Sequence, residues 1–436
     1  MTSTAHPISA SHKHTWLALF AWFMSAWTLR GGDGPLLMAL MLTCLWAFLT
    51  QTKNYKHPSL PNGVAVSIVV WCAVLMTGNL LRAFETFTFI PVDIEAQLKW
   101  FSLLMFVPVG WLLYQQQAKL QWLLLLPALI VLFRIVDHSS LETWQSDLFG
   151  SGFNGFGLHH VRFGMQASIA LIGLLALGPA LVQSLSKYRW LAAICLVLTS
   201  LIIAQALFRC GSRSGLICLA VGILVLLWRS RSSIFQRLFT RQGAVSSIFV
   251  LTLVVTTVVA NFDQLHKRFF IGAYQQASYS FSLDEIPRDK DVFLGRRLHL
   301  SAFGLDKWQQ SPVFGYGPGG ARVLLRADPD FHIHPHLHNM YVQALVEIGV
   351  SGVLAWLAIS ISLLIAVLKY GRYTQPPVLN YFWSIAIALA VWSLQSAAIY
   401  QASWRFSVVL VCALASAICY MGRQQEKAHS QSLESS

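Results

Sequence analysis

About twelve long apolar segments, separated by short polar stretches, constrain the fold of this chain of 436 residues more than any other feature. A helix needs about 20 predominantly apolar residues to cross a bilayer, where every backbone N–H and C=O must be hydrogen-bonded within the segment. The apolar segments cover residues 15–29, 35–51, 63–81, 101–114, 120–136, 164–184, 190–208, 214–228, 244–262, 351–368, 379–397 and 404–421. They predict an all-α polytopic membrane protein with about twelve transmembrane helices.

The composition agrees with this fold and excludes a cytosolic enzyme. Charged residues make up 11% of the chain, whereas a soluble domain contains about 25%. Nearly all of the seven cysteines lie within apolar segments, so we interpret them as small core residues and not as a disulfide framework or a zinc site. The apolar run from Trp16 to Leu29 is followed by no clear cleavage pattern of small residues, so it is predicted to be the first transmembrane helix.

The net charge of +13 follows from how Lys and Arg are distributed between alternate loops. If the N-terminus is cytoplasmic, the loops on that side contain many basic residues but only two acidic ones, Glu426 and Glu434. Positively charged loops remain in the cytoplasm, which predicts cytoplasmic N- and C-termini. The basic run 229–237 then anchors a cytoplasmic loop against anionic lipid, and no nucleic-acid partner is expected.

The predicted helices divide the chain into four parts. Residues 1–262 contain transmembrane helices 1–9, residues 263–350 form one large external loop, residues 351–421 contain helices 10–12, and residues 422–436 form a cytoplasmic tail. The sequence contains no phosphate-binding loop of the type G-x-x-x-x-G-K-[ST], and no cytoplasmic loop is long enough for a nucleotide-binding domain. ATP-driven chemistry is therefore not expected, and a functional site is expected in the external loops.

The most distinctive polar segment of the large loop contains histidines at four alternate positions. They are His332, His334, His336 and His338, which an extended backbone would place on one side. The pattern has three interpretations: a metal site, a general base and a histidine-rich surface turn. Pro335 interrupts the run and weighs against a metal. His338 is the best-placed base, because Asn339 is a typical N-cap residue for the apolar helix that follows.

Two arginines, Arg209 and Arg213, flank a Cys-Gly-Ser sequence at the external end of the seventh predicted helix. They share one helix face if the helix continues across Gly211. The surrounding Gly-Ser-Arg-Ser-Gly sequence also lets backbone N–H groups approach an anion. Arginine at membrane depth usually marks a functional site, so both are candidates for anion binding. The alternative, snorkelling to the interface, suits Arg209 better than Arg213.

A second pair of arginines, Arg296 and Arg297, begins a segment with apolar residues at helical spacing. The apolar positions are Leu298, Leu300, Phe303 and Trp308. This spacing predicts an amphipathic helix along the membrane surface. The glycine-rich stretch 315–320 that follows predicts a tight turn. Further basic candidates in the external loops are Arg162, Lys307 and Arg322.

Three of these motifs, in this order, resemble the signature of the O-antigen ligase and polymerase superfamily. They are Ser212-Arg213 at an external helix end, Arg297 about fifteen residues before Pro312-x-x-Gly315-x-Gly317, and His336-x-His338-Asn339 followed by Glu347-x-Gly349-x-x-Gly352. The aromatic residue often found four positions after the arginine is replaced here by Ser301. The resemblance covers residues from about 200 to 352, and the predicted helix pattern extends it to the whole chain.

The resemblance implies a GT-C-like fold with a periplasmic loop at 263–350, in a protein of the bacterial inner membrane. It implies an O-antigen ligase that transfers polysaccharide from undecaprenyl diphosphate to a sugar hydroxyl of lipid A–core. The reaction would be inverting and would need no metal or cofactor. His338 would be the general base and Arg213 and Arg297 would bind the diphosphate. Arg209 and Arg296 would be reserve ligands, His336 and Asn339 would orient the base or contact substrate, and Glu347 would hold the junction between loop and membrane helix.

Two alternatives remain at the level of the sequence. An O-antigen polymerase would use the same motifs to transfer the glycan onto a second lipid-linked glycan. The chain length and the single large loop after the ninth predicted helix favour the ligase. A lipid-linked glycan flippase or transporter would also have about twelve helices, but such proteins usually contain paired repeats with interrupted helices, and this sequence contains no such repetition.

Overall fold

The computed structural model describes residues 49, 62–85, 94–139, 155–238, 259, 262, 293–396 and 398–434. These residues form helices and connecting turns, without a strand among them. The helices are α3 (Asn62–Glu85), α4 (Ile94–Phe101), η1 (Ser102–Met105), α5 (Phe106–Gln115), η2 (Gln117–Lys119), α6 (Leu120–Leu124), α7 (Leu126–His138), α9 (His160–Ser184), η3 (Ser186–Tyr188), α10 (Arg189–Cys210), α11 (Arg213–Leu238), α15 (Phe293–Gln310), α16 (Gly320–Ala327), α17 (Met340–Tyr370), η6 (Gly371–Tyr373), α18 (Pro376–Ser393), η7 (Ala398–Tyr400) and α19 (Ala402–Glu434).

Eight stretches of the described chain are long and apolar enough to cross a bilayer. They are Glu95–Gln115, Gln117–His138, His160–Ser184, Ser186–Cys210, Arg213–Arg231, Met340–Tyr373, Pro376–Ser393 and Ser403–Ser432, with a shorter apolar helix at Gly63–Thr77. Each coincides with one of the apolar segments of the sequence, so the polytopic all-α fold is confirmed for this part of the chain. Three predicted segments, 15–29, 35–51 and 244–262, lie almost entirely outside the described residues.

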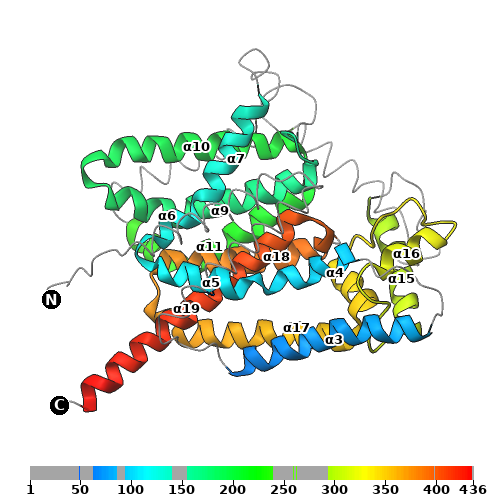
Figure 1. Ribbon diagram of the computed structural model, residues 1–436. Coiled ribbons are helices and arrows are strands. Elements are labelled where there is room, and N and C mark those ends of the chain that lie inside the picture. Colours follow the sequence, from blue (N-terminus) through cyan, green and yellow to red (C-terminus); the bar gives the residue numbers. More distant parts are fainter. Residues whose placement is uncertain are drawn as a thin grey trace.

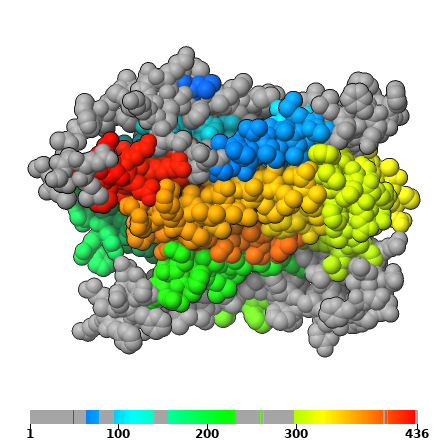
Figure 2. Space-filling model, turned by 90° about the horizontal axis from the view of Figure 1, so that it is seen from below, coloured from blue at the N-terminus to red at the C-terminus, as the bar shows by residue number. Residues whose placement is uncertain are grey.

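The long helices lie side by side, with α15 and α16 together at one end of the bundle and the C-terminal end of α19 at the opposite end (Figure 1). Successive helices alternate in direction, so α9, α11, α17 and α19 all begin at the α15–α16 end. Figure 2 shows α17 along one face, between α3 on one side and α18 and α11 on the other. The α15–α16 end is therefore the end at which four helix N-termini and the described part of the large loop meet.

The outward faces of the long helices are apolar. On α10, Leu191, Ile194 and Leu198 are all more than half exposed. On α19, by contrast, nearly every residue from Trp404 to Met421 is buried. Exposed leucine and isoleucine at helical spacing match the hydrocarbon tails of a bilayer, which are as apolar as these side chains. The exposure pattern therefore fits a bundle with α19 inside and α10 facing lipid.

A close approach of two glycines fixes α11 against α9. A Cβ atom at Gly215 would lie 2.8–2.9 Å from backbone atoms of Gly164. The hydroxyl of Ser168 lies 2.6 Å from the Gly164 carbonyl oxygen and 2.7 Å from that of Gly215, and it donates to these oxygens. Small residues at helix interfaces let membrane helices approach closely. This contact brings the first turn of α11 beside the first turn of α9.

A second close contact breaks α17 near its beginning. Gly349 has φ +63° and ψ −175°, so the helix is interrupted there. A Cβ atom at Gly349 would lie 2.2 Å from the carbonyl oxygen of Val313, in the turn that the sequence predicts after α15. Gly315 in this turn has φ +65°, and the Tyr316 N–H donates to the Val346 carbonyl at 2.7 Å. The glycine turn is thus bonded to the interruption of α17, and both glycines are required by their left-handed backbones.

We expect Gly215→Ala to destabilise the bundle, because its Cβ can be accommodated only if α9 and α11 separate. An overpacked helix contact costs about 1–3 kcal/mol, which lowers the thermal unfolding midpoint of the purified protein by several degrees. The matched control is Gly63→Ala, where the nearest atom is the flexible Ser362 hydroxyl at 3.2 Å. Equal midpoints for the two variants would contradict the close packing.

Candidate active site

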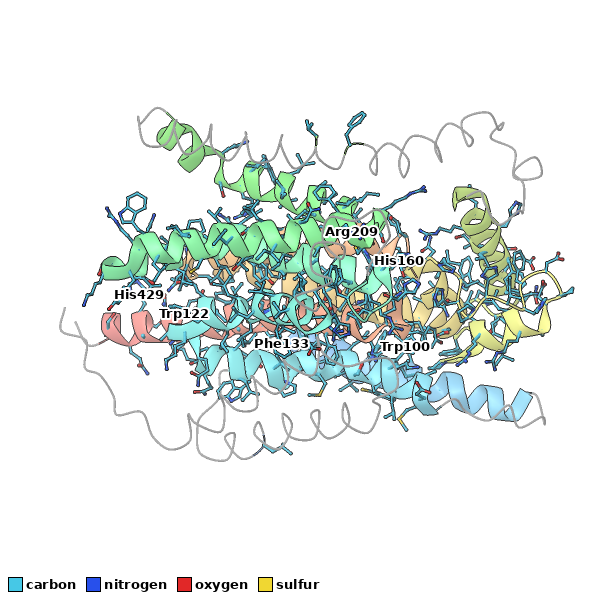
Figure 3. All side chains as sticks on the ribbon, turned by 90° about the horizontal axis from the view of Figure 1, so that it is seen from above. Trp100, Trp122, Phe133, His160, Arg209 and His429 are labelled. Carbon is cyan, nitrogen blue, oxygen red and sulfur yellow. The ribbon has the colours of Figure 1, made fainter. Side chains whose placement is uncertain are left out.

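The polar motifs of the sequence meet at the α15–α16 end of the bundle. The loop 328–339 leads from α16 into α17, and the first turns of α9, α11 and α19 lie at the same end. Figure 3 shows His160 and Arg209 there together with Trp100, whereas Trp122 and His429 lie at the opposite end. Residues from several segments, most of them distant in sequence, therefore lie at this end of the bundle.

His338 directly precedes the helix start of α17, as the sequence predicts. Asn339 is the N-cap, and its Oδ1 accepts hydrogen bonds from the N–H groups of Tyr341 and Val342 at 3.0 and 3.4 Å. His338 has φ +55° and is one of two non-glycine residues with positive φ in the described part of the chain, the other being Phe156. Such a backbone costs about 1–3 kcal/mol and persists only where its surroundings impose it. The position of His338 is therefore determined by its neighbours.

The four histidines do not lie on one side of an extended strand. The segment is a series of turns, in which the His334 N–H donates to the Phe331 carbonyl at 2.8 Å. His332 is exposed and its Nδ1 contacts the carbonyl of Pro329. The rings of His336 and His338 are neighbours, with centroids 4.2 Å apart, and that of His334 lies 6.1 Å from His338. Within the described residues, no three His, Cys, Asp or Glu side chains converge in a way that could hold a metal ion.

Arg209 and Arg213 lie on two different helices, so the condition for one shared helix face, a helix that continues across Gly211, is not met. Gly211 has φ +61° and ends α10, because a left-handed residue after the last turn caps a helix. Arg213 then begins α11, where the Gly215 N–H donates to the Ser212 hydroxyl at 3.1 Å. Arg209 is buried in the last turn of α10, whereas Arg213 is half-buried. Both remain at the α15–α16 end.

Arg297 extends from α15 toward the connection between α18 and α19. Its Nη1 donates to the carbonyl of Gln395 at 2.8 Å, just beyond the end of α18. Burial, and then the positive charge of Arg213, lower the pKa of Arg297 to about 10. Arg297 therefore stays charged at neutral pH, close enough to Arg213 for the two charges to repel. Arg296 lies one residue earlier on α15, and its side chain lies outside the described residues.

His336 lies in the same positively charged surroundings. Burial lowers its pKa to about 4, with further contributions from the positive charges of His334, Arg297 and Arg162. The imidazole of His336 is therefore neutral at neutral pH. It does not add a positive charge beside His338.

Two further arginines lie at the α15–α16 end of the bundle. Arg162 lies in the first turn of α9 and is close enough to His336 and to Arg405 for its charge to act on both. Arg405 is buried in the first turn of α19, where its Nη1 donates to the Ile399 carbonyl at 2.5 Å. The sequence suggested Arg162 only as a further basic candidate, and it did not suggest Arg405. An arginine at the start of an apolar segment is a signal that could have found Arg405.

Glu347 holds the beginning of α17 against two other elements, as the sequence predicts. Its side chain is fully buried. It accepts hydrogen bonds from the indole N–H of Trp100 on α4 at 2.8 Å and from the hydroxyl of Tyr400 in η7. Lys99 also lies over the ring of Tyr400, 5.0 Å from its centroid. The junction between the loop and the membrane helix is thus tied to α4 and to the connection between α18 and α19.

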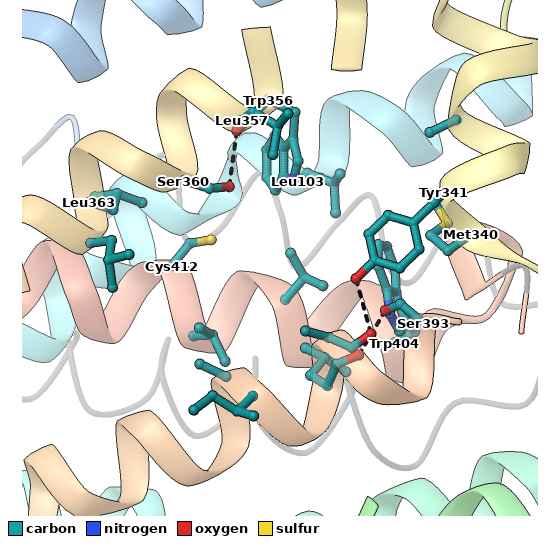
Figure 4. A pocket seen from close by; sticks show the side chains of 18 of the residues that line it. Leu103, Met340, Tyr341, Trp356, Leu357, Ser360, Leu363, Ser393, Trp404 and Cys412 are labelled. Carbon is teal, nitrogen blue, oxygen red and sulfur yellow. Dashed lines mark hydrogen bonds between the residues drawn. The ribbon is translucent and has the colours of Figure 1, made fainter. Parts of the chain in front are cut away.

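An apolar cavity of about 620 Å³ lies between α17, α18 and α19. It begins at Met340 and Tyr341, directly after the N-cap of α17, and extends along this helix past Trp356 to Leu363 (Figure 4). The Tyr341 hydroxyl donates to the carbonyl of Ala390 at 3.0 Å. Nearly all other lining groups are hydrocarbon or aromatic. The cavity can therefore hold a hydrocarbon chain whose polar end lies near His338.

Comparisons with known proteins agree with these observations. Residues 198–357 match the family model described as O-antigen ligase. This region extends from α10 into α17 and contains Arg209, Arg213, Arg297 and the histidine turn. No curated protein matches the chain. This matched region, which is less than half of the chain, is therefore similar to the O-antigen ligase family.

Proposed function

We propose that the chain is an O-antigen ligase that transfers a polysaccharide from undecaprenyl diphosphate to a sugar hydroxyl of lipid A–core. Members of the family are glycosyltransferase-like enzymes of O-antigen processing. The observation that carries the proposal is the combination of His338 at a fixed helix start with two mutually repelling arginines, Arg213 and Arg297. Glycosyl transfer from a diphosphate requires a base for the acceptor hydroxyl and positive charges for the leaving diphosphate, and both are present at this site.

In the proposed reaction, His338 accepts the proton of the acceptor hydroxyl. The hydroxyl oxygen attacks the anomeric carbon of the first sugar, on the face opposite the diphosphate. The bond between this carbon and the diphosphate oxygen breaks, its electron pair leaves with the diphosphate, and the configuration is inverted. Because His336 is neutral, it places no positive charge beside His338 before His338 accepts the proton. No metal or cofactor takes part in this scheme.

The leaving diphosphate gains negative charge and needs stabilisation more than it needs a general acid. Guanidinium groups bind phosphate oxygens through parallel, charge-assisted hydrogen bonds. The bond from Arg297 to the Gln395 carbonyl restricts the plane of its guanidinium. Arg213 contributes the second guanidinium, and Arg162, Arg209 and Arg405 add to the positive potential. An anion at this point relieves the repulsion between Arg213 and Arg297.

The apolar cavity supports a lipid-linked donor. A polyprenyl chain is hydrocarbon, and the cavity begins at Met340 and Tyr341 on the first turn of α17. A chain lying along α17 would keep its diphosphate at the α15–α16 end, beside the arginines. We propose that the cavity between α17, α18 and α19 holds the donor lipid. Lipid A–core would approach from the surrounding membrane.

We further propose that the site faces the periplasm of the bacterial inner membrane. The connections at the opposite end of the bundle contain Lys119, Lys187, Arg189 and Arg372. Basic connections remain on the cytoplasmic side. Both termini would then be cytoplasmic, and residues 263–350 would form the periplasmic loop with the catalytic motif. The transmembrane helices would lie in residues 1–262 and 351–421, and residues 422–436 would form the cytoplasmic tail.

The proposal is tested with purified protein, lipid-linked glycan and two competing acceptors, lipid A–core and a second lipid-linked glycan. A ligase forms glycosylated lipid A–core, which mass spectrometry detects, and releases undecaprenyl diphosphate. A longer lipid-linked glycan as the main product would instead identify a polymerase. Absence of both products, with movement of intact lipid-linked glycan between leaflets, would identify a flippase.

His338→Asn is expected to lower the transfer rate at least about 10²-fold, because the general base is lost. Asparagine tolerates a left-handed backbone, so the turn should persist and the unfolding midpoint should stay close to that of the wild type. His332→Asn is the control, since His332 is exposed in the same loop. Transfer by His338→Asn at the rate of the control would exclude His338 as the base.

Arg213→Lys and Arg297→Lys are each expected to lower kcat/KM by about 10-fold or more. Lysine retains the charge but loses the planar fork, and a lost hydrogen bond to a charged group costs about 1.5–3 kcal/mol. Steady-state kinetics measure the effect, with Arg326→Lys at an exposed position of α16 as control. Full activity of both variants would show that these arginines do not bind the diphosphate.

A further inference from the structure

Gln343 is a buried polar residue of α17 with no part in the mechanism described so far. Its side chain is fully buried, one turn after the N-cap. Its Oε1 accepts a hydrogen bond from the backbone N–H of Leu337 at 3.0 Å, and its Nε2 donates to Glu347 at 2.6 Å. Gln343 therefore connects the residue directly before His338 to the carboxylate that holds α17.

Glu347 determines which way the Gln343 amide points. The Glu347 carboxylate accepts from Trp100, from Tyr400 and from Gln343. The amide Nε2 is the atom that faces Glu347, which suits a side chain that also accepts from the indole N–H of Trp100, a group that can only donate. The amide oxygen then faces Leu337, whose N–H is a donor. Two hydrogen bonds thus link Leu337 to Gln343 and Gln343 to Glu347, and Trp100 and Tyr400 anchor Glu347 on other elements.

The hydrogen bonds from Glu347 through Gln343 to Leu337 fix the backbone on one side of His338. The side chain of Leu337 is buried against α15, where a Cβ atom at Gly304 would lie 2.8 Å from it. On the other side, Asn339 is fixed as the N-cap of α17. The left-handed backbone of His338 lies between these two anchored residues. Loss of the Gln343 bond would free the Leu337 peptide, and with it the direction of the imidazole.

We infer that Gln343 is a positioning residue for glycosyl transfer, which aims His338 at the acceptor hydroxyl through the Leu337 backbone and is itself oriented by Glu347. The inference rests on the proposed role of His338 as general base. Gln343 is fully buried, so we expect its loss to lower turnover and to leave substrate binding unchanged. A misplacement of about 1 Å in a reacting group can cost about 10²-fold in rate.

Gln343→Met tests this role, because methionine has a similar shape and lacks both hydrogen bonds. We expect kcat for the transfer reaction to fall about 10- to 100-fold, with KM for lipid-linked donor and for acceptor within about twofold of wild type. Ser416→Ala on α19 is the matched control. It removes a buried side-chain bond to the Cys412 carbonyl, outside the site, and should leave kcat unchanged. Unfolding midpoints and size-exclusion profiles establish the folded fraction.

A charge exchange provides the second test. Gln343→Glu retains an acceptor for the Leu337 N–H but places a second carboxyl group beside Glu347 and removes the donor between them, so kcat should fall. Combining it with Glu347→Gln restores a donor and an acceptor between the two positions, and kcat should recover by about tenfold relative to the single variant. A Gln343→Met variant with wild-type kcat overturns the inference. If that variant does not fold, equal kcat values for the single and the combined variants overturn it.

The two proposals fail in different ways. If wild-type protein forms no transfer product, the proposed function is wrong. If the wild type is active, His338→Asn is inactive and Gln343→Met retains full kcat, the function stands and the positioning role is wrong. A raised KM with unchanged kcat in Gln343→Met would also contradict the positioning role, because it would indicate a contact with substrate.

Discussion

The hydrogen-bonding demand of the backbone in lipid determines where this protein can place irregular structure. Inside the bilayer, every N–H and C=O must be paired within a helix. The described left-handed residues Gly211, Gly315 and His338 lie between helices at the α15–α16 end, and Gly349 interrupts α17 beside the turn that contains Gly315. The same end contains the polar motifs. The candidate active site thus occupies the part of the bundle in which the chain can turn.

Helix starts supply most of the charged groups of the site. Arg162, Arg213 and Arg405 each lie in the first turn of a helix, and His338 lies just before another. The N-terminus of a helix carries a partial positive charge and unpaired N–H groups. The helices therefore add to the potential of the arginines, and burial keeps that potential from being screened by water. This arrangement of charges suits an anionic substrate.

The sequence was informative where the signal is local. Apolar length predicted the eight described stretches that are long enough to cross a membrane, Asn339 was a recognisable N-cap, and the glycine cluster predicted the turn at 315–320. The turns at residues 332–338 and the helix break at Gly211 were harder to predict. Histidines at alternate positions suggest an extended strand, and two arginines four residues apart suggest one helix. The grouping of Arg162 and Arg405 with His336 depends on packing between helices far apart in sequence. No local pattern encodes such contacts, nor the bond from Gln343 to Leu337.

The interruption of α17 at Gly349 divides this helix into two parts with different surroundings. The glycine turn is bonded on both sides of the break, through Tyr316 to Val346 and through Pro312 to Val350. The longer part lies among the membrane helices, whose tilt responds to bilayer thickness. The shorter part, which follows His338, is held by α4, α15 and η7 instead. The turn therefore supplies hydrogen bonds at the point where the helix is interrupted, and it fixes the direction of the short part that follows the histidine turn relative to the membrane part.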